Sequence, residues 1–62
     1  MDSIDRKILA ELQADGRLSL TELAERVNLS LSPCHRRVRA LEQSGAITGY
    51  RANLDPAKMG FN

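Results

Sequence analysis

The segment from Ser30 to Ser44 has the pattern of an amphipathic helix, and this pattern restricts the folds that the chain can adopt. At about 100° of rotation per residue, Cys34, Val38 and Leu41 share one face of that helix. The opposite face carries polar and basic side chains, namely Ser32, Arg36, Arg39 and Gln43. Such a helix has to bury its apolar face against other elements while its basic face stays outside. A basic outer face of this kind suits insertion into the major groove of DNA.

The composition limits the chemistry that the chain can perform. Its 62 residues make one small domain, which buries only about 60 % of the surface of the unfolded chain. A single cysteine excludes an internal disulfide and a multi-cysteine metal site, and a single histidine cannot supply a metal cage. The sequence shows neither a nucleophile paired with a base nor a glycine-rich phosphate loop. We therefore do not expect an enzyme, and we expect no metal and no cofactor.

The distribution of apolar residues indicates a cytoplasmic protein. No run approaches the roughly 18 consecutive apolar residues of a membrane span. Asp2 and Asp5 stand where a secretory signal peptide has basic residues. We expect no membrane partner.

The net charge of +1 hides an asymmetry along the chain. Residues 1–29 hold four basic and six acidic side chains, whereas residues 30–62 hold five basic and two acidic ones. The basic residues are densest from Arg36 to Arg39. Because a basic helix face can also be a plain solvated surface, the charge alone leaves that interpretation open. The arrangement of the neighbouring helices favours DNA.

Apolar residues at helical spacing predict three helices, at about 3–14, 20–27 and 31–44. Gly16 is well placed to end the first helix in a left-handed conformation. Ser19 and Glu22 have the spacing of a capping box, which would open the second helix.

Four residues set the bounds of the third helix. Asn28 tolerates the left-handed conformation that breaks the helix before it. Ser30 is expected to cap the third helix, and Pro33 falls in its first turn, where a missing amide costs nothing. Gly45 ends the helix. A short helix, a tight turn and an amphipathic helix in this order are typical of a helix-turn-helix unit.

Alternating apolar and polar residues predict a strand over about 47–54, with Tyr50 and Leu54 on one side of it. The pair Asp55-Pro56 then signals a turn. A lone strand leaves its backbone groups without a sheet partner, so the partner would be the tail, another chain or residues outside this sequence. The expected fold is mainly α: a three-helix helix-turn-helix of the winged-helix type with a single C-terminal β-strand or hinge.

The helix-turn-helix arrangement assigns roles in binding double-stranded DNA. Phosphate contacts position such a domain, and base contacts select its site. The amides that open the second helix, with the Thr21 hydroxyl, are candidates for a phosphate contact. Arg37 and Arg39 can reach phosphates or guanine edges, although Arg37 lies nearer the core and can pair with an acidic neighbour. The candidate DNA-binding residues are Thr21, Ser30, Ser32, Pro33, His35, Arg36, Arg37 and Arg39.

Three further side chains are expected to have structural roles, and two other functions remain open. Cys34 should be a buried, unreactive thiol, Glu42 a partner for a nearby cation, and Tyr50 a packing residue under the wing. The main alternative function is a protein-interaction or assembly module that docks its basic helix on an acidic surface. RNA binding is a third possibility, against which the shortage of aromatic residues speaks weakly.

Several motifs together resemble the Lrp/AsnC family (leucine-responsive and asparagine-operon regulators) of transcription factors. They are Ile4 to Leu9, Leu12 to Arg17, Glu22 to Ala24, Asn28 to Ser30, Ser32 to Cys34, Arg37 to Arg39, Leu41 with Glu42, the set Gly45, Ile47, Gly49 and Tyr50, and Leu54 to Pro56 with Gly60. The resemblance implies a winged helix-turn-helix DNA-binding domain over residues 1–54, whose third helix reads DNA. His35 and Arg36 stand at positions that vary within the family, and they make this helix more basic than many.

The resemblance also implies features that lie beyond this sequence. Residues 55–62 would start a linker to a C-terminal α/β domain that binds amino acids and assembles dimers and octamers. The full protein would then be a homo-oligomer that responds to an amino-acid effector only through that second domain. The missing partner of the predicted strand would lie in the second domain or in another subunit.

Overall fold

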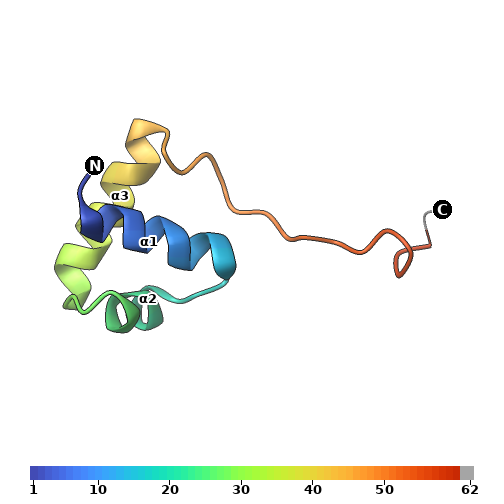
Figure 1. Cartoon of the computed structure of the whole chain (residues 1–62), viewed down its shortest axis with the longest axis horizontal. Helices are drawn as coiled ribbons and strands as arrows, with labels where there is room; N and C mark the ends of the chain where they lie inside the picture. Colours follow the sequence, from blue (N-terminus) through green and yellow to red (C-terminus); the bar gives the residue numbers. More distant parts are fainter. Residues whose placement is uncertain (61–62) are drawn as a thin grey trace.

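The computed structural model describes residues 1–60, in which three helices form one small body. Helix α1 spans Ser3–Ala14, α2 spans Leu20–Arg26 and α3 spans Leu31–Ser44. The three predicted helices are confirmed, and α2 ends one residue earlier than expected. Figure 1 shows that the chain after α3 leaves this body as a long tail, which explains the overall extents of 44 × 23 × 17 Å. No helix within residues 1–60 is both long and apolar enough to cross a lipid bilayer.

Local hydrogen bonds explain where α1 begins and ends. Asp2 caps the helix, because its Oδ1 accepts a hydrogen bond of 2.8 Å from the backbone N–H of Asp5. At the other end, the prediction of a left-handed Gly16 is wrong, since its φ is not positive. Instead, the carboxylate of Asp15 accepts a hydrogen bond of 2.9 Å from the backbone N–H of Arg17. This side-chain turn reverses the chain without a left-handed residue.

The predicted capping box opens α2. The Ser19 hydroxyl accepts a hydrogen bond from the backbone N–H of Glu22, and the Glu22 carboxylate accepts one from the backbone N–H of Ser19, each at 3.1 Å. These hydrogen bonds, first of all the one from the Ser19 amide, lower the pKa of Glu22 below its ordinary value. A helix of only seven residues depends on such capping hydrogen bonds and on packing, because an isolated helix of this length is not stable in water.

The turn between α2 and α3 also follows the prediction, with one exception. Asn28 is left-handed, with a φ of 57°, and the backbone N–H of Leu29 donates to the carbonyl of Ala24 at 2.9 Å. Ser30 does occupy the N-cap position of α3, but its hydroxyl makes no capping hydrogen bond. Gly45 ends α3 with a φ of 87°, as expected. The Ser30 hydroxyl is therefore not engaged at the start of α3.

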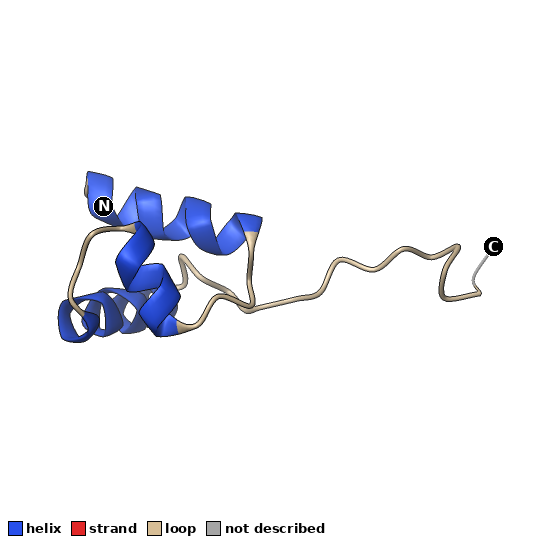
Figure 2. Cartoon of the chain, turned by 90° about the horizontal axis from the view of Figure 1, so that it is seen from below, coloured by secondary structure: helices blue, strands red, loops and turns tan. Residues whose placement is uncertain are grey.

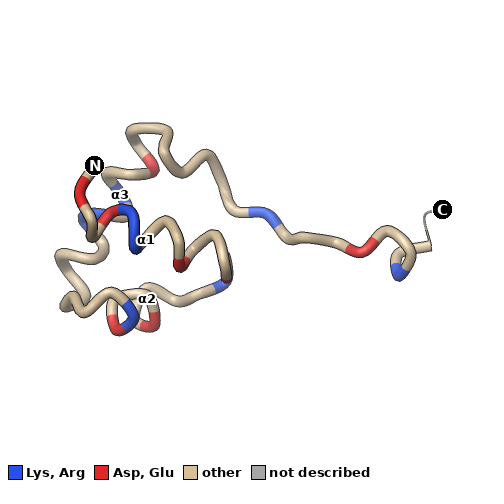
Figure 3. The backbone as a smooth tube through the Cα atoms, viewed as in Figure 1, with Lys and Arg blue, Asp and Glu red and all other residues tan. Residues whose placement is uncertain are grey.

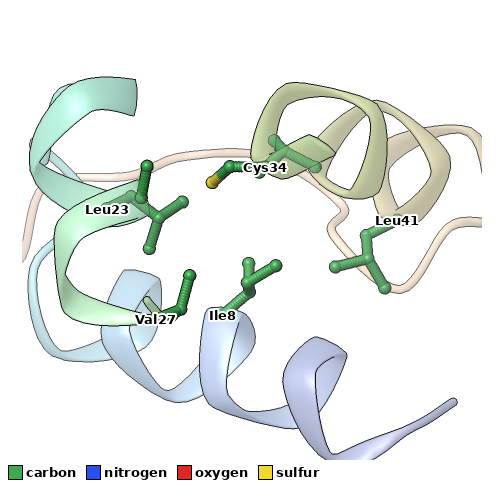
Figure 4. Packing of buried hydrophobic residues seen from close by; sticks show 7 residues of the cluster. Ile8, Leu23, Val27, Cys34 and Leu41 are labelled. Carbon is green, nitrogen blue, oxygen red and sulfur yellow. The ribbon is translucent and has the colours of Figure 1, made fainter. Parts of the chain in front are cut away.

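The core forms where one face of each helix meets the other two. Its seven buried residues are Ile8, Leu23, Ala24, Val27, Cys34, Val38 and Leu41. Figure 4 shows Ile8 pointing from α1 into the space between Leu23, Cys34 and Leu41. The apolar face predicted for α3 is thus confirmed, and its basic face is left outside the core.

Cys34 is fully buried, with an exposure of 0 %, and burial raises the pKa of its thiol. Since the thiolate is the reactive form, we expect a thiol reagent at neutral pH to modify the folded chain at least about 100-fold more slowly than the chain unfolded in guanidinium. The measurement is the rate of modification with and without denaturant, with free cysteine as the control for the effect of denaturant on the reagent. Equal rates in the two states would show that the thiol is accessible.

The strand predicted over 47–54 does not form among the described residues. After Gly45 the chain turns back so that the backbone N–H of Ile47 donates to the Leu41 carbonyl at 3.1 Å. Residues 48–55 then run without regular structure, and Figure 2 draws them as a loop that leaves the helices. The physical reason is that residues 1–60 offer no second strand to pair with these backbone groups. The turn signalled by Asp55-Pro56 is present, and the backbone N–H of Met59 donates to the Asp55 carbonyl at 3.2 Å.

Candidate nucleic-acid interface

The outer face of α3 carries two exposed arginines, Arg36 and Arg39. Both lie on the side of the helix opposite to the buried Cys34, Val38 and Leu41. Neither forms an ion pair with any of residues 1–60. Their guanidinium groups can therefore bind an external anion without first breaking an ion pair with these residues.

The first turns of α3 and α2 expose the small polar side chains that the sequence singled out. Ser30, Ser32 and His35 are exposed, whereas Pro33 is half-buried in the first turn of α3. Thr21 is exposed near the start of α2. The structure thus leaves four of these five side chains open to a ligand.

Leu31, the first residue of α3, is a surface feature that the sequence analysis missed. Half of its surface is exposed, although helical periodicity places it on the same side as the buried Val38. None of the α3 residues before Cys34 belongs to the buried core, so the core covers the apolar face of α3 only from Cys34 onward. An apolar side chain at the leading end of a DNA-reading helix can contact the methyl group of thymine. No pattern in the sequence signalled its exposure.

Arg37 differs from Arg36 and Arg39 because its guanidinium forms ion pairs at the start of α1. Its Nη1 donates to both carboxylate oxygens of Asp2, at 3.0 and 2.8 Å, and to Oδ1 of Asp5 at 3.2 Å. In Figure 3 the backbone of α3 at its basic residues passes near the acidic start of α1, which lets these ion pairs form. The hydrogen bonds that Arg37 donates to Asp2 and Asp5 raise the pKa of Arg37, and the same hydrogen bond to Asp2 is the main cause that lowers the pKa of Asp2.

This ion pair predicts how acid changes stability. Because the pKa of folded Asp2 lies below its ordinary value of 3.8, its pair with Arg37 stabilises the fold above that value and is lost as the pH falls through the lowered pKa. We expect Arg37→Met to reduce the free energy of unfolding slightly at about pH 6, and the difference from the unsubstituted chain to vanish towards about pH 2. Urea unfolding of both chains across this range measures the difference. A difference that stays constant with pH would contradict the assignment to Asp2.

Glu42 and Tyr50 interact with each other at the point where the tail leaves α3. The Tyr50 hydroxyl donates to Oε2 of Glu42 at 2.9 Å, so the expected pairing of Glu42 with a cation is wrong. Burial and, next, this hydrogen bond raise the pKa of Tyr50. Half of the tyrosine remains exposed, and its hydrogen bond to Glu42 holds the start of the tail to α3.

Within residues 1–60 there is also no cluster of side chains suited to a metal ion.

The comparisons with known proteins agree with this geometry. Residues 1–48 match a family model described as winged helix-turn-helix DNA-binding, and the chain belongs to that family. It is 56 % identical over its whole length to the leucine-responsive regulatory protein of Rhizobium meliloti, and 59 % identical over 56 residues, or 90 % of its length, to that of Escherichia coli K12. The chain spans 40 % and 34 % of these two relatives.

Solved structures identify the group within that family. An AsnC family transcriptional regulator from Agrobacterium tumefaciens matches with a TM-score of 0.91 and 47 % identity, over 95 % of this chain and 39 % of that one. A transcriptional regulator from Neisseria meningitidis, solved in complex with L-methionine, matches with a TM-score of 0.92 and 49 % identity, over 95 % and 38 % of the two chains. The chain thus matches the N-terminal DNA-binding domain of Lrp/AsnC regulators, as the sequence motifs indicated.

Proposed function

We propose that this chain binds double-stranded DNA in a sequence-specific manner, with α3 in the major groove. The observation that carries the proposal is the outer face of α3, where Arg36 and Arg39 are exposed and form no ion pair with residues 1–60. The helix is held from behind by its buried apolar face, so binding needs no rearrangement of the core. The description of the family to which the chain belongs, winged helix-turn-helix DNA-binding, supports the proposal.

The exposed residues divide by the part of DNA that they can reach. Arg36 and Ser32 lie nearest the base edges when α3 enters the groove, so they would select the sequence. Arg39 and His35 lie to one side of these residues, where a phosphate or a guanine edge is within reach. The hydroxyls of Thr21 and Ser30 would bind backbone phosphates, and Pro33 would shape the first turn of α3 at the groove.

We further infer that the chain is the DNA-binding part of a larger regulator, with residues 1–54 as the domain and 55–62 as the start of a linker. The chain spans less than half of its relatives, and one of those relatives was solved in complex with L-methionine. An amino-acid effector and the surfaces that make a homo-oligomer would then lie outside these 62 residues. A regulator of this kind works in the cytoplasm, where bacterial DNA lies.

Fluorescence anisotropy with a labelled duplex of mixed sequence tests DNA binding directly. We expect weak binding that falls as salt rises, because each phosphate contact releases counterions and a single small domain makes few contacts. An affinity that does not change with salt would contradict the proposal.

Amide chemical shifts on titration with the duplex separate DNA binding from a protein-interaction module. We expect the largest shifts in α3 and in the first turn of α2. Shifts confined to α1, or no shifts at all, would favour the protein-interaction module instead.

A further inference from the structure

We propose that Arg37 is a positioning residue, which fixes how α3 presents its outer face, and that it does not itself touch DNA. This inference rests on the proposed function. One guanidinium nitrogen from the middle of α3 holds two carboxylates, those of Asp2 and Asp5, at 2.8 to 3.2 Å. Both carboxylates belong to the first turn of α1 or to its cap. The contact therefore joins the start of one helix to the middle of another, across 32 to 35 residues of sequence.

The direction of Arg37 separates it from the proposed DNA-binding residues. At about 100° per residue, Arg37 and Arg39 point about 160° apart around the axis of α3. When Arg39 faces the groove, Arg37 faces α1. Arg37 already binds two carboxylates there, so a phosphate that approached this side would have to compete with Asp2 and Asp5 for the guanidinium.

The same contact adds a directional restraint to the packing of α3. Apolar packing of Ile8, Val38 and Leu41 is not directional in itself, so a directional contact outside the core restrains the rotation of α3 about its own axis further. Charge-assisted hydrogen bonds to a carboxylate are directional. Asp2 is itself fixed, because its Oδ1 also accepts the capping hydrogen bond from Asp5. Arg37 thus sets the rotation of α3, and with it the direction of Arg36 and Arg39.

Three substitutions test this role in the 62-residue chain. Arg37→Met removes the charge and keeps an unbranched apolar side chain over the core. Arg37→Lys keeps the charge, but it places a compact ammonium on a shorter side chain, which cannot hold Asp2 and Asp5 with the same geometry as Nη1 of arginine. Asp2→Asn removes one negative charge and keeps the cap, because asparagine caps a helix about as well as aspartate. Circular dichroism first establishes that each variant is folded under the conditions of the DNA titration.

The inference predicts a specific set of DNA affinities. Arg37→Met should weaken binding about threefold to tenfold, in the range of couplings between contacting residues, and leave the salt dependence unchanged. Arg37→Lys should restore only part of the loss. Asp2→Asn should also weaken binding, although it makes the chain more positive. The double variant should bind no more weakly than Arg37→Met alone, because both substitutions break the same contact.

A direct phosphate contact predicts the opposite results. Arg37→Met would then lower the slope of log affinity against log salt by about 0.9, as expected for one lost contact. Asp2→Asn would strengthen binding by freeing the arginine, and Arg37→Lys would bind as the unsubstituted chain does. Any of these three results, or an unchanged affinity of folded Arg37→Met, overturns the inference.

A measurement without DNA separates this inference from the proposed function. Residual dipolar couplings report the orientation of α3 relative to α1. We expect the orientation to change in Arg37→Met and in Asp2→Asn alike. If it stays unchanged in both variants, the inference is wrong even if the chain binds DNA. If the unsubstituted chain fails to bind DNA, the proposed function is wrong, and the orientation still decides the structural role.

Discussion

Truncation of Ile8 to alanine should remove a large part of the stability of this fold. Ile8 is fully buried, and it is the α1 residue that points between the buried side chains of α2 and α3 (Figure 4). Loss of its side chain should cost about 2 to 5 kcal/mol, because it removes apolar contacts from both partner helices and leaves a cavity. Domains of about 60 residues have free energies of unfolding of about 3 to 9 kcal/mol. The loss is thus a large fraction of the total, and we expect Ile8→Ala to unfold at a much lower urea concentration than the unsubstituted chain.

Urea unfolding followed by circular dichroism measures this loss. Leu54→Ala is a suitable control, since it also truncates a large aliphatic side chain, but at a position that is 63 % exposed. Its effect should lie within about 0.5 kcal/mol of zero. Equal losses in the two variants would mean that Ile8 does not hold the three helices together.

The second large effect concerns DNA affinity. We expect Arg36→Ala to lower the affinity for a cognate duplex about fivefold to 150-fold, which corresponds to about 1 to 3 kcal/mol for a bidentate base contact. Arg39→Ala should weaken binding as well, and, if Arg39 binds a phosphate, it should reduce the salt slope by about 0.9. The physical reason is that both arginines are exposed and form no ion pair with a carboxylate of residues 1–60. Binding to DNA therefore breaks no such ion pair.

The test compares each variant with a substitution of the same charge elsewhere. Arg6 is exposed on α1, on the side of that helix away from the buried Ile8. Arg6→Ala therefore controls for the loss of one positive charge, and we expect it to weaken binding much less. The cognate duplex can be selected from a randomised pool with the unsubstituted chain. If all three alanine variants lose the same affinity, net charge rather than the face of α3 explains binding.

The helices could be predicted from the sequence because their bounds are set by neighbours a few residues away. Ser19 and Glu22 cap the start of α2 with two hydrogen bonds. Asn28 follows α2 with a positive φ, and Gly45 ends α3 in the same way. Such signals act over one turn, so they can be recognised without knowledge of the fold. Gly16 shows the limit of this reasoning, because the neighbouring Asp15 offered a second way to make the turn, and the sequence does not show which of the two is adopted.

Features that depend on distant residues could be predicted only in part. Arg37 lies beside the apolar face of α3, and this position suggested an acidic neighbour. Its partners are Asp2, which caps α1, and Asp5 in α1, and no local sequence pattern connects these two residues with Arg37. The exposure of Leu31 depends on how the three helices pack, which the periodicity of α3 alone does not show. The strand over 47–54 had the right alternation, yet alternation describes only one strand, and residues 1–60 hold no second one. Whether the candidate residues contact DNA depends on a partner, so it stays a prediction.

The tail has a consequence for how this domain can be joined to other protein segments. Between the Tyr50–Glu42 hydrogen bond and the turn at residues 56–60, the chain makes no contact that the seven core residues depend on. Insertions or deletions at residues 51–55 should therefore leave the stability of the helices almost unchanged, since lengthening an exposed connection costs little. The distance from α3 to the segment that follows the tail can thus change without a change in the three-helix fold.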